Sequence, residues 1–278
     1  MKVCIIGGGM MGISLGYFLS KNGMRVQVYE ASPELGGLAG RITLEDGTAV
    51  DRFAHEILPN DKNVQLLCTR LGLDSELRFR GTKTGFYYKG EIYPMNGLLD
   101  FVRFRPLSVL DRTRLGMAVL RTQMVRNRVG LESKNVEDWL VAICGHRSFE
   151  IVWRPLLNAQ LDGGLRSTPA AYIRSRLKHI KSTFYGFRQE ERVGYLVGGF
   201  SSLIEAMAAR IVESGGSIHV DYPVDEIMIN DNQAWGVRNE SVVSSFDLIV
   251  STVKVPIFRR LIPDACPAYI DFIDQTNI

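Results

Sequence analysis

A glycine-rich turn that begins at residue 7 constrains the fold of this chain more than any other feature. The segment GGGMMG at residues 7–12 matches the pattern G-x-G-x-x-G and directly follows the apolar run Val3–Ile6. The pattern predicts a buried strand over 2–6, a helix over 10–22 and a second strand over 25–29. In such a β-α-β unit the first glycine permits a tight turn, the second lets a pyrophosphate approach, and the third allows close packing of helix and strand.

An acidic residue stands at the end of the second predicted strand. Glu30 follows Gly12 by 18 residues, a position from which a carboxylate can hydrogen-bond ribose hydroxyls and repel the 2′-phosphate of NADP. The N-terminus of the predicted helix would offer unpaired N–H groups to phosphates. The alternative is that the glycines only shape a turn. The strand-turn-helix context favours dinucleotide binding.

The same N-terminal segment has the length of a membrane anchor. Val3–Ser20 carries no charge and is flanked by Lys2 and Lys21, as a spanning helix could be. Its glycines would weaken such a helix, and no small-residue cleavage site of a secretory signal follows. The run therefore favours a buried strand and helix over a membrane segment.

Composition and cysteine usage narrow the class of protein. The 278 residues are 46% hydrophobic and 23% charged, with a net charge of +3, which is typical of a globular protein and does not indicate nucleic-acid binding. The four cysteines are scattered without C-x-x-C spacing. We therefore expect reduced thiols, no metal site and a cytoplasmic location.

The remaining patterns alternate between α/β and helical segments. Residues 97–190 are mainly helical and resemble an insertion. We therefore expect an α/β fold in which 1–80 and 193–278 build a Rossmann-type domain, while 81–192 form an inserted, mainly helical substrate region. Further predicted elements are hairpins over 42–53 and 86–93, helices over 62–73 and 202–214, and strands over 217–220 and 246–251.

The stretch after the second strand distinguishes FAD from NAD. Residues 30–41, EASPELGGLAGR, resemble the superfamily of FAD-dependent amine oxidases, phytoene desaturases and protoporphyrinogen oxidases, in which a Gly-Gly pair and a basic residue follow the ribose-binding glutamate. The resemblance implies FAD as the cofactor and a glutathione-reductase-like FAD-binding domain. It also implies that Gly36 and Gly37 pass beside the pyrophosphate and that Arg41 lies near it.

Other segments extend this resemblance along nearly the whole chain. Residues 51–55, DRFAH, resemble the segment along the ribityl chain and flavin ring, and 195–200 resemble the return from the substrate domain. The resemblance implies that the Val224 backbone contacts adenine and that the segment around Thr252 closes over the flavin. The candidate cofactor-binding residues are Gly7, Gly9, Met10, Met11, Gly12, Glu30, Ala31, Gly36, Gly37, Leu38, Ala39, Arg41, Phe53, Ala54, His55, Val224 and Thr252.

The sequence departs from the family pattern in two places. Phe53 and His55 stand where many amine oxidases have glycines before the flavin ring, so we expect bulkier surroundings for the ring, lined by His55. The family's later glycine-acid segment has no counterpart up to Ile278. We therefore expect a truncated or split copy with poor turnover, and no catalytic residue is assigned.

A basic segment over 103–128 carries seven arginines and one aspartate among apolar residues. A basic amphipathic helix of this kind could contact an anionic membrane, which would suit a lipophilic substrate. The alternative is a solvated helix whose arginine stems pack on apolar neighbours. Both interpretations stay open from the sequence.

The resemblance implies an oxidoreductase in which FAD takes a hydride from a C–H bond next to nitrogen or a conjugated system, with a small molecule as substrate. Two alternatives remain. One is a non-catalytic binding protein on the same scaffold, like the Rab GDP-dissociation inhibitors. The other is a redox-neutral flavoenzyme resembling UDP-galactopyranose mutase.

Overall fold

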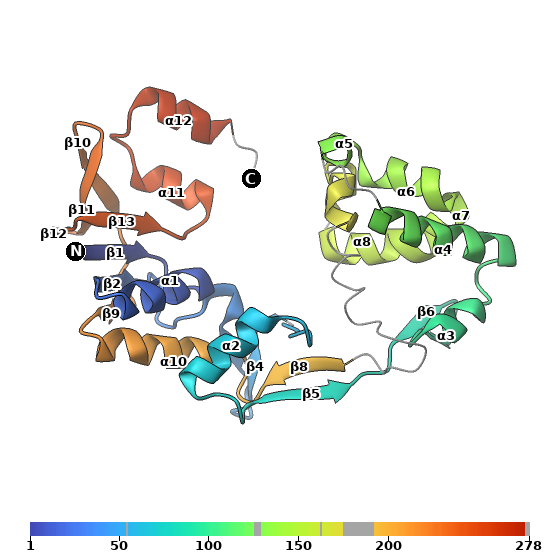
Figure 1. Cartoon of the computed structure of the whole chain (residues 1–278). Helices are drawn as coiled ribbons and strands as arrows, with labels where there is room; N and C mark the ends of the chain where they lie inside the picture. The colour runs from blue at the N-terminus through green and yellow to red at the C-terminus, as the bar shows by residue number, and fades with distance from the viewer. Residues whose placement is uncertain (54, 125–128, 162, 175–191, 276–278) are drawn as a thin grey trace. The chain divides into compact units, whose positions relative to one another are not determined.

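The computed structural model describes residues 1–53, 55–124, 129–161, 163–174 and 192–275 (Figure 1). The chain forms two compact units. Unit 1 comprises Met1–Ile57, Lys62–Arg78 and Tyr195–Ile278, and unit 2 comprises Leu58–Asp61 and Phe79–Gly194. Strands β5 (Leu77–Gly81) and β8 (Arg192–Leu196) carry the chain out of unit 1 and back. The substrate role expected for 81–192 stays a prediction.

Unit 1 is built on a four-stranded parallel sheet in the order β13-β1-β2-β9. The central strand β1 is buried on both faces, with Val3, Cys4 and Ile5 fully inaccessible, because both neighbours and the covering layers exclude water from it. All four carboxyl ends therefore meet at one edge of the sheet. The strands are β1 (Lys2–Ile6), β2 (Arg25–Tyr29), β9 (Ser217–His219) and β13 (Leu248–Ser251).

Helices α1 (Met10–Lys21) and α10 (Phe200–Glu213) pack together in unit 1. Close packing depends on Gly16, where an added Cβ would lie 2.9 Å from Ile211 Cδ1. The uncharged run near the N-terminus is thus strand β1, the glycine turn and helix α1, as predicted. None of the described helices has the length and apolar character needed to cross a membrane. The α/β fold with a parallel sheet is confirmed.

Three further segments complete the described part of unit 1. The hairpin β3 (Arg41–Thr43) and β4 (Ala49–Asp51) and helix α2 (Lys62–Leu71) match the predicted elements. An antiparallel meander and two C-terminal helices were not predicted. These are β10 (Glu226–Asn230), β11 (Gln233–Asn239), β12 (Val242–Ser245), α11 (Val255–Leu261) and α12 (Pro267–Asp274).

Unit 2 is mainly helical, as the sequence indicates. Its core joins Phe104, Leu140, Phe149, Trp153 and Leu157, all buried. The predicted hairpin is present, and Lys89 and Gly90 turn it with positive φ angles. The elements are β6 (Gly85–Tyr88), β7 (Glu91–Pro94), α3 (Leu98–Val102), α4 (Val109–Met124), α5 (Val129–Glu132), α6 (Val136–Cys144), α7 (His146–Ser148), a π-helical turn (Phe149–Trp153) and α8 (Arg154–Leu161).

The four cysteines differ sharply in accessibility. Cys4, Cys68 and Cys144 are buried, whereas Cys266 is exposed. Burial raises the pKa of the Cys4 thiol to about 12 and that of Cys144 to about 11, so both stay protonated and unreactive near neutral pH. We expect iodoacetamide at about pH 8 to label Cys266 alone in the folded protein. Intact mass spectrometry checks this, and equal labelling of Cys4 would contradict the described packing.

Candidate cofactor-binding site

The turn after β1 is held against the end of β2. Gly7 has φ +106°, a backbone conformation that favours glycine, and its N–H donates to the Tyr29 carbonyl at 2.8 Å. Gly8 is closely covered, since an added Cβ would lie 2.6 Å from Leu35 Cδ2 and 2.9 Å from Glu30 Cβ. There is therefore no room for a side chain at Gly8, and only glycine fits this position of the turn.

Gly9 and Gly12 lie in contrasting surroundings. A Cβ on Gly12 would lie 1.9 Å from the Gly7 carbonyl oxygen, so this glycine is required for packing between turn and helix. A Cβ on Gly9 would meet nothing closer than the Gly36 oxygen at 4.0 Å. Gly9 directly precedes α1, whose first N–H groups have no partner within the helix. The open side of Gly9 is therefore where a phosphate can approach these groups.

The second glycine segment lies directly on the first. The Gly36 N–H donates to the Gly8 carbonyl at 2.9 Å, and Gly36 forms a bridge with Gly9. A Cβ on Gly37 would lie 3.5 Å from Gly9 Cα. Residues Gly37–Ala39 then form a short 3-10 helix with Ala39 buried and Leu38 61% exposed. The tertiary structure thus brings together two glycine segments that are separated by more than twenty residues in the sequence.

The Glu30 carboxylate lies at the carboxyl edge of the sheet between these segments. Its Oε2 accepts from the Gly8 N–H at 2.6 Å, and its Oε1 accepts from the Ser32 N–H at 2.8 Å. The Glu30 N–H donates to the His219 carbonyl at 2.8 Å. These contacts fix the carboxylate and leave further lone pairs on both oxygens for a ligand. Ala31 is exposed beside it. The ribose contact of Glu30 stays a prediction.

The loop after β9 reaches the same edge of the sheet. Two hydrogen bonds of 2.9 Å attach it to the residues that follow β2: the Tyr222 N–H donates to the Glu30 carbonyl, and the Asp221 N–H donates to the Ser32 carbonyl. Val224 follows in this loop and packs on the core that includes Ile227. Val224 therefore lies two residues after Tyr222, whose N–H is bonded to the Glu30 carbonyl directly after β2. The adenine contact of Val224 stays a prediction.

Thr252 closes the turn from the β13 side. Its hydroxyl donates to the carbonyl of Ile6 at 3.0 Å and lies 3.2 Å from the carbonyl of Gly7. An added Cβ on Gly12 would also lie 3.0 Å from this hydroxyl oxygen. Thr252 therefore stabilises the glycine turn through its contacts with the carbonyls of Ile6, the last residue of β1, and Gly7. The sequence placed Thr252 over the flavin, and that role stays a prediction.

The remaining predicted residues are more exposed. Met11 is 71% and Phe53 53% exposed, and Met10 is half-buried. The guanidinium of Arg41 lies 3.2 Å from Glu205 of α10, and both side chains are largely accessible. This surface ion pair is weak, so it leaves Arg41 available to an anionic ligand. Ala54 lies outside the described residues.

Sequence reasoning missed the role of Asp51 beside this segment. Its Oδ1 accepts from the Phe200 N–H at 3.1 Å and so caps the start of α10. His55 lies nearby, with its ring centroid 5.0 Å from that of Phe200 and its Nδ1 2.7 Å from the Phe53 carbonyl oxygen. The sequence signal for this contact is the glycine at position 199, directly before α10. The structure gives the reason for it, because an added Cβ on Gly199 would lie 2.2 Å from Asp51 Oδ1.

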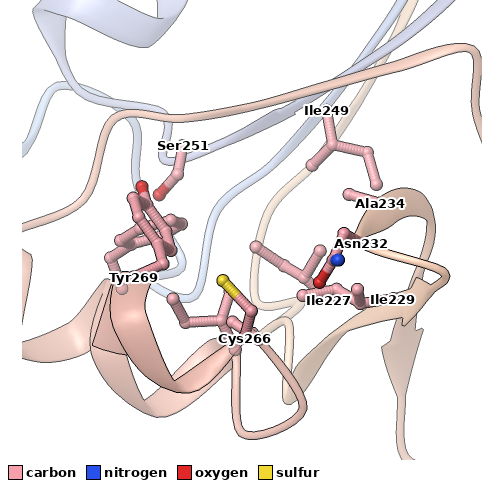
Figure 2. Close-up of a pocket in the computed structure, with 11 residues that line it drawn as sticks. Ile227, Ile229, Asn232, Ala234, Ile249, Ser251, Cys266 and Tyr269 are labelled. Carbon is pink, nitrogen blue, oxygen red and sulfur yellow. The ribbon is translucent and has the colours of Figure 1, made fainter. Parts of the chain in front are cut away.

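A separate cavity of about 370 Å³ lies elsewhere in unit 1. Figure 2 shows mainly apolar side chains around it, with the hydroxyls of Ser251 and Tyr269, the amide of Asn232 and the thiol of Cys266 as its polar groups. The Ser251 hydroxyl oxygen is buried without a partner among the described residues. The cavity shares no residue with the glycine segments and is mainly apolar, so it is not suited to a pyrophosphate. Its lining residues are Ile227, Ile229, Asn232, Ala234, Ile249, Ser251, Phe258, Ile262, Ala265, Cys266 and Tyr269.

A family model described as flavin containing amine oxidoreductase matches residues 10–277. The chain belongs to the flavin-containing amine oxidoreductase family. The flavin cofactor expected from the sequence is thereby confirmed at the level of the family, as is the oxidoreductase class.

Known proteins agree with this assignment. The zeta-carotene desaturase of Zea mays is 23% identical over 95% of this chain and 51% of its own length, and the coproporphyrinogen III oxidase of Staphylococcus aureus is 23% identical over 100% and 66%. The crystal structure of an oxidoreductase from Methanosarcina mazei superposes with a TM-score of 0.78 at 20% identity, covering 99% of this chain and 65% of that one. The chain spans about half to two thirds of the length of these relatives.

Proposed function

We propose that this chain provides the cofactor-binding part of an FAD-dependent oxidoreductase that removes a hydride from a C–H bond next to nitrogen or a conjugated system. The observation that carries the proposal is the direct contact between the two glycine segments, at Gly9 and Gly36, beside the Glu30 carboxylate. A nicotinamide site needs the first glycine segment and the acid. It has no need of a second glycine segment at the same place.

The residues present fit such a cofactor. The open side of Gly9 admits a pyrophosphate to the N-terminus of α1, whose positive dipole end stabilises negative charge. Glu30, held by two main-chain N–H groups, presents its remaining lone pairs to ribose hydroxyls. When bound, the flavin supplies the hydride acceptor. The chain's own residues bind and orient it. His55 lies on the segment proposed to adjoin its ring, and the His55 ring centroid is 5.0 Å from that of Phe200 at the start of α10.

Two relatives support a conjugated substrate over an amine. They are named as a zeta-carotene desaturase and a coproporphyrinogen III oxidase. We propose a polyene or a tetrapyrrole as the substrate class, with unit 2 contributing to its binding. The family model is described as amine oxidoreductase, so an amine remains the alternative that the experiment must compare.

The test is a titration of the purified chain with FAD, followed by absorbance and flavin fluorescence. We expect saturable binding with a perturbed flavin spectrum, and slow anaerobic bleaching of the flavin when a polyene or a porphyrinogen is added, in keeping with the poor turnover expected from the sequence. The Gly9→Val variant serves as the control that folds but does not bind.

Each result bears on a separate part of the proposal. Absence of FAD binding in a folded protein would overturn the cofactor assignment. Binding without reduction by polyene, porphyrinogen or amine would favour the non-catalytic alternative. Isomerisation of UDP-galactopyranose by the reduced protein, without net flavin oxidation, would favour the mutase alternative instead.

A further inference from the structure

Five large apolar side chains are exposed on α3 and the first turn of α4 in unit 2. The exposed fractions are 60% for Leu98, 67% for Leu99, 57% for Val102, 69% for Val109 and 77% for Leu110. Single exposed apolar residues are common on protein surfaces. Several large apolar side chains exposed on two consecutive helices are unusual and often mark a binding surface. Figure 1 shows these two helices joined by a short connection.

The exposure does not come from helices that lack a core face. Phe104 and Leu107 in the connection, and Leu115 and Ala118 in α4, are buried in the core of unit 2. Phe101 of α3 packs on the same core. The two helices thus already bury one apolar face, and the five exposed residues belong to a second one.

The two helices are attached to each other. The Arg112 guanidinium donates to the Val102 carbonyl. A Cβ on Gly116 of α4 would lie 3.7 Å from the Phe101 ring of α3. The exposed residues of α3 therefore keep a fixed position relative to the start of α4.

Basic side chains accompany this face, while the nearby carboxylates have partners in the fold. Arg103 and Arg105 are exposed in the connection. Asp111 is offset by Arg147, whose Nε lies 3.8 Å from the Asp111 Oδ2. Asp100, which accepts from the Asn96 N–H at 2.9 Å, keeps its negative charge. Arg103 and Arg105 outnumber this one carboxylate, so the face has an excess of positive charge.

The other arginines of the segment 103–128 differ in their surroundings. Arg114 is exposed but lies against the end of α6, where its guanidinium donates to the Ala142 carbonyl at 3.2 Å and lies beside Gly145. Arg126 and Arg128 lie outside the described residues. Apolar residues farther along α4 are exposed as well, with exposed fractions of 51% for Met117 and 61% for Leu120. The exposed apolar face therefore begins at α3 and continues into α4.

We propose that α3, its connection to α4 and the first turn of α4 form a surface that binds anionic lipid membranes. We call this the α3–α4 surface, made of Leu98, Leu99, Val102, Arg103, Arg105, Val109 and Leu110. The leucines and valines would enter the boundary between headgroups and acyl chains, while the arginines remain at the phosphates. The positive charge is the observation that selects an anionic bilayer over an uncharged apolar partner.

The experiment is cosedimentation of the chain with phosphatidylcholine vesicles, with and without phosphatidylglycerol. We expect binding only to the anionic vesicles and a loss of binding at high salt. The double variant Arg103→Glu/Arg105→Glu should bind at least about 25-fold more weakly, since each basic residue near the surface contributes roughly fivefold. Leu98→Ser/Leu99→Ser should bind about tenfold more weakly or not at all.

Matched controls come from exposed residues of unit 1. Arg25→Glu makes the same charge reversal per site, and Val212→Ser removes an apolar side chain that is 55% exposed. Neither control should change vesicle binding. Circular dichroism checks that all variants fold, which the exposure of every substituted residue leads us to expect.

Three results would overturn the proposal. One is no binding of the folded wild type to anionic vesicles, and another is equal binding to uncharged ones. The third is a leucine variant that loses self-association in sedimentation velocity but keeps vesicle binding, which would make this surface an interface between copies of the chain.

Discussion

Substitution of Gly12 by valine should unfold or severely destabilise unit 1, whereas the same substitution at Gly9 should leave the fold intact and abolish FAD binding. The Gly12 Cβ would lie 1.9 Å from the Gly7 carbonyl oxygen, and main-chain atoms cannot move away as a flexible side chain can. Overpacking costs about 1–3 kcal/mol, and a clash with main-chain atoms places this variant at the upper end. A loss of about 3 kcal/mol lowers Tm by roughly 6–12 °C in a chain of this size.

Gly9 differs because its Cβ would meet no atom within 4 Å except the Gly36 oxygen at 4.0 Å. Its φ of −70° suits any residue. A valine there would instead fill the space through which we expect the pyrophosphate to reach the start of α1. The loss is therefore expected in FAD affinity and not in stability.

Thermal unfolding followed by circular dichroism, together with FAD titration, separates these two outcomes. Gly97→Val is the control, because a Cβ at that position meets nothing within 4 Å. Retained FAD affinity in Gly9→Val would remove the pyrophosphate from this site. An unchanged Tm in Gly12→Val would show that Gly12 does not pack against the Gly7 carbonyl.

Replacement of Glu30 by alanine should weaken FAD binding by about 1–3 kcal/mol, or roughly 5- to 150-fold. The carboxylate is positioned by the N–H groups of Gly8 and Ser32, so it can present its other lone pairs to the ribose without losing its orientation. The variant should also lose some stability, because the Gly8 N–H is left in a buried turn without its acceptor.

Isothermal titration with FAD and with ADP measures the effect, since ADP carries the same ribose without the flavin. We expect both ligands to lose affinity by a similar factor. Glu45→Ala, at an exposed position in the turn of the β3-β4 hairpin, is the matched control. Dissociation constants within twofold of the wild type for Glu30→Ala would remove Glu30 from the ribose site.

Local patterns in the sequence determined much of unit 1. The apolar run into Gly7, the helix ended by Gly23 and the strand ending at Tyr29 are each encoded within a few residues, so β1, α1 and β2 were predicted close to their observed bounds. The Lys89-Gly90 turn was equally local, because its positive φ angles favour such residues. The family resemblance then supplied the cofactor class that the family model confirms.

The meander β10-β11-β12 and helices α11 and α12 escaped sequence reasoning. Strands β11 and β12 are largely exposed on one face and carry glycine and polar residues, so their apolar period is weak. Their stability comes from packing of Val237 and Phe246 with Leu261 and Ile273, which are distant in the sequence. Such contacts have no local signature.

The sequence by itself determined the β-α-β unit, the cofactor class and the residue types of the site. Only the tertiary structure decided that Gly36 lies on Gly8 and Gly9, that Glu30 is fixed by two N–H groups, and that Gly12 is a packing position while Gly9 is open. The physical reason is that a glycine looks the same in every sequence. What its missing side chain makes room for depends on which atoms the rest of the fold brings within 4 Å.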